Sequence, residues 1–237
     1  MSANMQFKDQ LALVTGASRG IGAATALALA KQGAHVILTA RDSAALEEVE
    51  EQIHADGGSA TIAPLDLTDG DSIGRLAKAI SDRWDSLDIM ILNAAMLGTL
   101  GPVPAIDGKE LNNVMTLNFI AQQALIAAFD GMMRKSDDAR LLAITSSVGA
   151  SPRAFWGAYG ASKAALETLV LSYGEEMRNI GKFRTAIINP GKTRTDMRAR
   201  AYPGEDPASV KQPQVVADRM IEILASDFET GKRFDLG

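Results

Sequence analysis

The chain has 237 residues, of which 46% are apolar and 22% charged, a composition typical of a globular domain and unlike that of a disordered chain. The net charge of −5 argues against a nucleic-acid-binding surface, and no apolar run reaches the roughly 18 residues that a membrane-spanning helix needs. The chain has no cysteine and two unclustered histidines, so it offers neither a disulfide nor an obvious metal site. The start, MSANMQFKDQ, lacks the apolar core of a signal peptide, and we expect a cytoplasmic protein.

Short apolar segments alternate with longer segments of helical period along the chain. Strands are predicted over 11–15, 34–40, 59–67, 87–94, 139–146 and 182–191, with a short last strand within 231–237. Helices are predicted over 20–33, 43–57, 68–84, 108–134, 156–180 and 213–225. We expect Ser43 to cap the second helix and the third to begin at Thr68.

This alternation predicts βαβ units and therefore a parallel sheet. The fold class is α/β: a single Rossmann-type, doubly wound domain over 1–237, with a mainly parallel sheet of about seven strands flanked by helices. We find no composition break, internal repeat or low-complexity segment that would divide the chain. In sheets of this kind, ligands bind beyond the carboxyl ends of the strands.

A glycine-rich turn, TGASRGIG (15–22), follows the first predicted strand. Gly16, Gly20 and Gly22 stand where the strand must turn tightly into a helix, so the backbone could approach a pyrophosphate closely. The spacing is G-x-x-x-G-x-G, which is neither the common G-x-G-x-x-G fingerprint nor a P-loop. Its position in the first βαβ unit nevertheless predicts nucleotide binding.

The ends of the second and third strands bear on the choice of nucleotide. Arg41 stands where an NAD site usually carries an acidic residue for the ribose 2′-hydroxyl, and Arg19 lies in the glycine turn. Two guanidiniums favour a 2′-phosphate, hence NADP(H) over NAD(H), although Arg41 could also be merely solvated. Asp42 is the counter-argument, because it could repel that phosphate or bind the ribose itself. Asp66 ends the third strand and could accept a hydrogen bond from an adenine amino group or cap the next helix; its position favours the ligand.

A possible proton-transfer site follows the fifth strand. Tyr159 and Lys163 are spaced i and i+4, so they share one helical face, and Ser146 ends the strand before them. A tyrosine titrates near 10 in water, and a neighbouring cation favours its phenolate, which would bring the hydroxyl nearer to working pH. Ser146 would hold the substrate oxygen and Tyr159 would move the proton. No histidine lies nearby, which argues against serine hydrolase chemistry.

The motifs TGASRGIG, LNAA, TLNFIA, TSSVG, YGASK and NPGKTRT occur in the order and spacing of the short-chain dehydrogenase/reductase family. The chain resembles that family over nearly its whole length. The resemblance implies an NAD(P)-dependent oxidoreductase that interconverts a carbonyl and a secondary alcohol, with the catalytic set Ser146, Tyr159, Lys163 and Asn118. It also implies that Asn118 fixes a water on a proton relay through Lys163, which would hold the nicotinamide ribose.

The same resemblance implies a set of cofactor-binding residues. Asn93 would stabilise the central strand, Ala94 would line the cofactor, and Thr195 would contact the carboxamide or the diphosphate. The expected set is Gly16, Ser18, Arg19, Gly20, Ile21, Gly22, Arg41, Asp66, Leu67, Asn93, Ala94, Ala95, Tyr159, Lys163, Pro190, Gly191, Thr193 and Thr195.

One motif departs from the family pattern, and the pattern leaves the identity of the catalytic serine open. The usual Asn-Asn-Ala-Gly reads Leu-Asn-Ala-Ala at 92–95, and the extra methyl of Ala95 narrows the approach to the cofactor. Two serines end the fifth strand. Ser146 fits the S-x-x-G pattern with Gly149, and Ser147 replaces it if the strand ends one residue later.

Residues 192–212 are polar, contain proline and glycine, and could form a lid over the substrate. Phe155 and Trp156 could line an apolar pocket for a hydrophobic carbonyl compound or pack the start of the following helix. Three lid residues could contact an anionic substrate or a cofactor phosphate, or be solvated: Arg194, Arg198 and Arg200.

We expect a small-molecule carbonyl or alcohol as substrate and no nucleic-acid or membrane partner. The resemblance implies a homodimer or homotetramer built on the helices at 108–134 and 156–180, and the alanine-rich second helix is compatible with such packing. A catalytically silent nucleotide-binding regulatory protein would have no need of all four catalytic residues. A SAM-dependent methyltransferase would not need Tyr159 and Lys163. A dehydratase or epimerase of the same family would reuse the same tyrosine.

Overall fold

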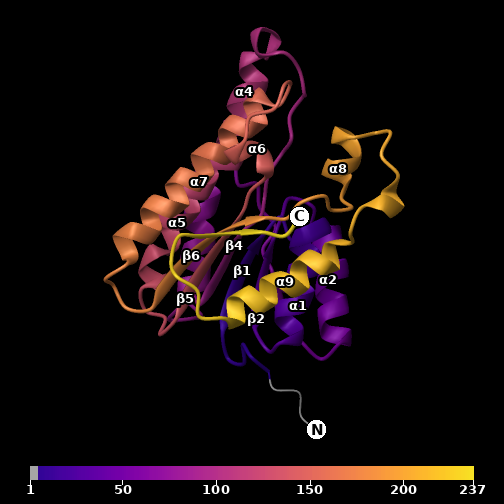
Figure 1. Ribbon diagram of the computed structural model, residues 1–237. Coiled ribbons are helices and arrows are strands. Elements are labelled where there is room, and N and C mark those ends of the chain that lie inside the picture. The colour runs from indigo at the N-terminus through magenta and orange to yellow at the C-terminus, as the bar shows by residue number, and fades with distance from the viewer. Residues whose placement is uncertain (1–4) are drawn as a thin grey trace.

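Seven parallel strands form one sheet in the order β3-β2-β1-β4-β5-β6-β7 in the computed structural model, which describes residues 5–237 (Figure 1). The predicted α/β class and parallel sheet are confirmed, with every paired strand parallel to its neighbour. The strands are β1 (Leu11–Thr15), β2 (His35–Thr39), β3 (Ser59–Ile62), β4 (Ile89–Leu92), β5 (Ala139–Ile144), β6 (Phe183–Asn189) and β7 (Lys232–Asp235).

Helices cover both faces of the sheet, as its strands require by being apolar on both sides. Alternate residues of β1 show the division: Ala12 and Val14 pack with α1, α2 and α9, whereas Leu11 and Leu13 pack with α3, α5 and α7 (Figure 1). The α-helices are α1 (Gly20–Lys31), α2 (Ser43–Ala55), α3 (Gly70–Ser81), α4 (Gly108–Met115), α5 (Ala121–Met133), α6 (Ser147–Ala150), α7 (Gly157–Met177), α8 (Asp196–Ala201) and α9 (Pro213–Ala225). Shorter helical turns are η1 (Val103–Ala105), η2 (Thr116–Ile120) and η3 (Pro207–Ser209).

The order of the strands reverses between β1 and β4, which lie side by side at the centre of the sheet. From β1 the chain continues outward to β2 and β3, then returns across β1 to β4 and proceeds to β5, β6 and β7. Doubly wound sheets bind their ligands outside the carboxyl ends of the strands at this switch point. None of the helices within residues 5–237 is long and apolar enough to cross a membrane.

Several predicted element boundaries needed correction. The third strand ends at Ile62 rather than at residue 67, because its one neighbour, β2, itself ends at Thr39, and Ile62 pairs with Leu38. Beyond it, Ala63 N and Leu65 N still donate to Leu38 O and Ala40 O. Asp42, not Ser43, caps α2: its carboxylate accepts a hydrogen bond from Ala45 N at 3.2 Å, and Ser43 is the first helical residue.

The third helix begins at Gly70 with Asp69 as its cap, not at Thr68. The hydroxyl and backbone N–H of Thr68 both donate to the carboxylate of Asp66 instead, which forms a turn just before the helix.

The long helix predicted over 108–134 contains a π-helical turn. Helices α4 and α5 are joined through η2 (Thr116–Ile120), where the N–H of Ala121 donates to Thr116 O, five residues earlier. A turn of this kind inserts one extra residue and changes which side chains face the protein interior. Asn118, fully buried, lies in this turn.

Gly22 should tolerate no side chain, because a Cβ there would overlap Gly16 O and lie 2.6 Å from Asn93 Nδ2. We expect Gly22→Ala to lower the free energy of unfolding in urea by about 1–3 kcal/mol, the usual effect of overpacking. Gly74→Ala on α3 is the matched control, since nothing lies within 4 Å of its added Cβ. The control should be neutral or more stable by up to about 1 kcal/mol. A Gly22→Ala protein as stable as wild type would contradict this description of the turn.

Candidate active site

The glycine turn between β1 and α1 is fixed to the neighbouring strand by a set of buried hydrogen bonds. Gly16 and Gly20 adopt positive φ angles of 64° and 59°, which favour glycine. The amide Nδ2 of Asn93, just after β4, donates to Thr15 O at 2.8 Å and to Gly16 O at 3.2 Å. Thr15 Oγ1 in turn accepts from the backbone N–H groups of Asn93 and Ala94. The turn is therefore held open and close to the end of β4.

The residues expected at the far end of a dinucleotide lie on the same edge of the sheet. Arg41 follows β2 and is exposed. The pKa of the Asp66 carboxyl is lowered mainly by its two hydrogen bonds from Thr68, and the positive charge of Arg41 adds to this effect. Asp42 is engaged in capping α2, so its carboxylate already has a partner in the helix backbone. Arg19 Nε lies 3.5 Å from Asp196 Oδ2, the first residue of α8, and both side chains are exposed.

Asn118 ties the loop after β4 to the helix α7. Its Oδ1 accepts from Met96 N at 2.8 Å, and its Nδ2 donates to Met96 O at 2.9 Å and to Ser162 Oγ at 3.0 Å. Ser162 Oγ donates in turn to Tyr159 O. Both amide hydrogens of Asn118 are thus used to hold the segment that contains Ala94 and Ala95 against α7.

Tyr159 and Lys163 are both buried on α7, with exposed fractions of 7% and 2%. Lys163 Nζ donates to Ile144 O, the last residue of β5, at 2.9 Å and lies 5.8 Å from the centre of the Tyr159 ring. Burial lowers the pKa of Lys163 to about 8, partly opposed by the negative charge of Glu167. Burial also raises the pKa of Tyr159, so in the polypeptide alone the expected shift toward neutral pH is absent.

The two candidate serines differ in burial and in position. Ser146 is half-buried, has extended backbone angles and caps α6, whereas Ser147 is exposed and is the first residue of that helix. Val148, on α6, packs against Tyr159 in one buried apolar cluster with Leu97. The structure thus brings α6 and its cap, Ser146, against the start of α7.

The loop after β6 carries Pro190 and Gly191 at the same edge. Thr193 is buried and its hydroxyl donates to Pro190 O at 3.2 Å. Thr195 caps α8 by accepting from Arg198 N at 3.1 Å, and its methyl lies 3.4 Å from where a Cβ of Gly20 would stand. This loop therefore passes directly over the glycine turn.

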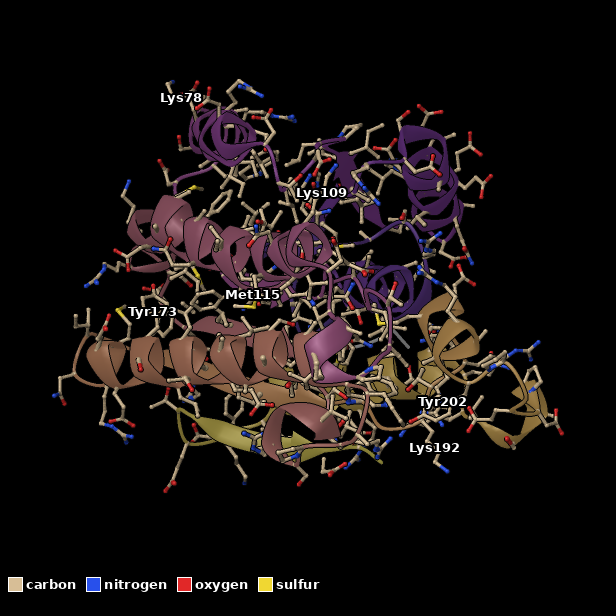
Figure 2. The ribbon with its side chains drawn as sticks, turned by 90° about the horizontal axis from the view of Figure 1, so that it is seen from above. Lys78, Lys109, Met115, Tyr173, Lys192 and Tyr202 are labelled. Atoms are coloured by element: carbon tan, nitrogen blue, oxygen red, sulfur yellow. The ribbon has the colours of Figure 1, made fainter. Side chains whose placement is uncertain are left out.

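The segment 192–212 contributes α8 to the apolar surroundings of Tyr159. Met197 and Ala201 of α8 pack against the apolar cluster that contains Tyr159. The Trp156 ring lies 5.9 Å from that of Tyr159 and 5.8 Å from that of Tyr202. Viewed down on this edge, Tyr202 stands beneath α8 on the side of α7 (Figure 2).

Charged side chains hold the segment to the loop before α7 and to itself. Arg153 Nη1 donates to the Tyr202 hydroxyl, and the Arg198 guanidinium lies 3.6 Å from the centre of the Tyr202 ring. Arg198 also forms two hydrogen bonds with Glu205, at 2.5 and 2.6 Å. Arg198 is thus committed to a partner within its own segment, whereas Arg194 and Arg200 are exposed. Phe155 is exposed as well, with φ of 72°.

Sequence reasoning missed three side chains that organise this site. Thr15 and Ser162 make the hydrogen bonds described above, and Glu167 lies buried one helical turn after Lys163. The first two are hydroxyl residues with no distinctive spacing. Glu167 could have been noticed, because it is a carboxylate at i+4 from the lysine and so lies on the same face of the helix.

With this geometry in place, the comparison with known proteins defines the class. The family model of short chain dehydrogenases matches residues 10–206. An oxidoreductase of Escherichia coli K12 named YciK is 36% identical over 96% of this chain and 91% of its own. A 3-oxoacyl-[acyl-carrier-protein] reductase of Synechocystis is 31% identical over 96% of this chain and 95% of its own.

Solved structures agree. A short chain dehydrogenase of Shigella flexneri 2a in complex with NADP superposes with a TM-score of 0.94 at 35% identity, covering 99% of each chain. One from Escherichia coli CFT073 in complex with NADPH gives a TM-score of 0.92 at 37% identity, again over 99% of each chain. The chain belongs to the short-chain dehydrogenase/reductase family of NAD(P)-dependent oxidoreductases.

The two serines can be separated by kinetics. We expect Ser146→Ala to lower kcat for carbonyl reduction by about 10²–10³-fold, the usual effect of removing a donor to a developing oxyanion. Ser147→Ala, at an exposed position, should change kcat by less than about threefold. A larger loss in Ser147→Ala than in Ser146→Ala would reverse the assignment.

Proposed function

We propose that the protein is an NADP(H)-dependent reductase that interconverts a small-molecule carbonyl compound and its secondary alcohol. The observation that carries the proposal is the buried pair of Tyr159 and Lys163 on α7, packed against α6, whose cap is Ser146, at the edge of the sheet where the glycine turn lies. A protein that only bound a nucleotide would gain nothing from burying a lysine and a phenol beside that turn.

The residues at this edge fit a dinucleotide. The tight turn at Gly16 and Gly20, both with positive φ, would let a pyrophosphate approach the backbone, and the start of α1 offers its free N–H groups there. Arg41 is exposed beyond β2, where its guanidinium would suit a 2′-phosphate, and the Asp42 carboxylate is used by its helix cap rather than offered to a ribose hydroxyl. That relatives at 35% and 37% identity were solved with NADP and NADPH supports the same choice.

In this proposal Ser146 holds the substrate oxygen by donating its hydroxyl hydrogen, and Tyr159 protonates that oxygen as it becomes an alkoxide. When bound, the nicotinamide supplies the hydride. Lys163 has three N–H donors, of which Ile144 O takes one, which leaves two for the ribose and for a proton relay. Its charge opposes the effect of burial on Tyr159 by favouring the phenolate.

We assign Asn118 a role in holding this relay. Because its side chain already binds Met96 and Ser162, the most direct contribution of Asn118 is to fix the loop after β4 relative to α7.

The segment 192–212 is proposed as the substrate lid. Tyr159 is 7% exposed beneath Met197 and Ala201, so this segment has to move before a substrate can reach the phenol.

A homo-oligomer and a cytoplasmic location remain predictions of the sequence. Light scattering of the purified protein and fractionation of cells would check them.

We expect the substrate to be largely apolar, because the side chains packed around Tyr159 are apolar. They are Leu97, Leu100, Val148, Trp156, Met197 and Ala201.

Cofactor choice tests the proposal directly by fluorescence titration with NADPH and with NADH. We expect NADPH to bind more tightly, and Arg41→Ala to weaken NADPH binding by about tenfold while leaving NADH unchanged, as for the loss of a charge-assisted hydrogen bond. Arg75→Ala, an exposed arginine on α3 paired with Asp69, is the control and should change neither. Equal or tighter binding of NADH would contradict the 2′-phosphate assignment and point to Asp42.

A further inference from the structure

Glu167 is a buried carboxylate that no part of the proposed reaction uses. It lies on α7 one turn after Lys163 and is 4% exposed. An ionised carboxylate is costly to bury unless charged and hydrogen-bonding partners surround it. Its partners therefore indicate what the residue does.

The carboxylate of Glu167 has two partners, from different parts of the chain. Oε1 accepts from the hydroxyl of Thr145, and Oε2 accepts from the guanidinium of Arg233 on β7. Thr145 stands between Ile144, whose carbonyl accepts from Lys163, and Ser146. The carboxylate is thus hydrogen-bonded to the segment that contains Ser146 and whose Ile144 carbonyl accepts a hydrogen bond from Lys163.

Gly149 shows how closely these groups approach. A Cβ at this position of α6 would lie 2.9 Å from Glu167 Oε1 and 3.2 Å from Lys163 Cβ. The carboxylate of Glu167 and the Cβ of Lys163 therefore both lie next to Gly149. Glycine at the fourth position of the Ser-x-x-Gly motif lets α6 lie directly on both.

Few charged groups lie around Lys163 and Glu167 in the described part of the chain. Among residues 5–237, the titratable groups around the lysine are Tyr159 and Glu167 on α7 and Arg233 on β7, with Asp235 acting on Arg233. Strand β5, helix α6 and the residues between them contribute uncharged groups: Ile144 O, Gly149 and Thr145. Burial lowers the pKa of Lys163 to about 8, and Glu167 is the group that opposes this effect. The Arg233 side chain is 40% exposed, so it pairs with the carboxylate from the solvent side.

We propose that Glu167 is a positioning residue: its carboxylate fixes the end of β5 that carries Ser146 and keeps Lys163 in its ammonium form. The role of this lysine in catalysis rests on the proposed function, whereas the effect of Glu167 on its charge does not. The ammonium form matters because it favours the phenolate of Tyr159, the base that alcohol oxidation requires.

The direct test is titration of Lys163 by NMR in the full chain without cofactor or substrate. Protein labelled with 13C at the lysine Cε would be followed from pH 6 to 11, with the Lys163 signal identified by its loss in Lys163→Met. We expect Glu167→Gln to lower the Lys163 midpoint by about 1 pH unit or more, as for the loss of an opposite charge at close range. Arg233→Met should raise the Lys163 midpoint, because the Glu167 carboxylate then stabilises the lysine ammonium without a second cation that partly neutralises it.

Opposite shifts in the two variants would support the proposal. A folded Glu167→Gln protein whose Lys163 midpoint stays within about 0.3 pH units of wild type would overturn it and leave Glu167 a packing residue. If Glu167→Gln does not fold, Arg233→Met decides alone, and an unchanged midpoint in that variant overturns the proposal equally.

An activity measurement separates this proposal from the proposed function. In Glu167→Gln, the rate of alcohol oxidation with NADP should decline above the lowered lysine midpoint, while wild type continues to gain rate at the same pH. If no alcohol or ketone reacts even with wild type, the proposed function fails, but the lysine titration still shows whether Glu167 controls the charge of Lys163.

Discussion

The parallel arrangement of β1, β4 and β5 is the constraint on which the site depends. Parallel strands end at a common edge, so the residues that follow each of them are brought together without any sequence proximity. At this edge, the glycine turn follows β1, Asn93 follows β4 and Ser146 follows β5. The hydrogen bonds from Asn93 to Thr15 O and Gly16 O then fix the first two of these relative to each other.

The second constraint is the burial of charge on α7. Lys163 is nearly inaccessible, and its ammonium has one backbone acceptor and one nearby carboxylate. Because so few groups compensate this charge, we expect each of them to affect the protonation state of the lysine. Arg233 enters this balance from β7, which links the edge of the sheet to the chemistry proposed at its centre.

The fold follows from the sequence because its signals are local and repeated. The alternation of apolar runs and helical periods is sufficient for the parallel sheet, and the helix predicted at 213–225 has those bounds in the structure. The glycine turn and the spacing of Tyr159 and Lys163 are also short-range patterns, so the amino-acid sequence alone reveals them. Two predicted boundaries failed because they depend on a partner that local pattern does not show: β3 ends where its neighbour β2 ends, and the Asp42 carboxylate caps α2.

Other features could not be predicted, because they depend on residues far apart in the sequence or on very small changes of period. The π turn at η2 adds one residue to a helical period, a change too small for periodicity to show. The pairing of Glu167 with Arg233 joins residues 66 positions apart, and nothing in either local sequence indicates the other. The contact of Tyr202 with Trp156 likewise depends on how the segment 192–212 lies over α7.

Transfer of deuterium would test the central claim most directly. NADPH carrying deuterium at C4 of the nicotinamide would be incubated with a panel of apolar ketones, and the alcohols would be analysed by mass spectrometry. The account predicts an alcohol one mass unit heavier when the label is on one face of the ring, and almost no product with Tyr159→Phe. An alcohol without deuterium from either face, or one formed as quickly by Tyr159→Phe, would contradict it.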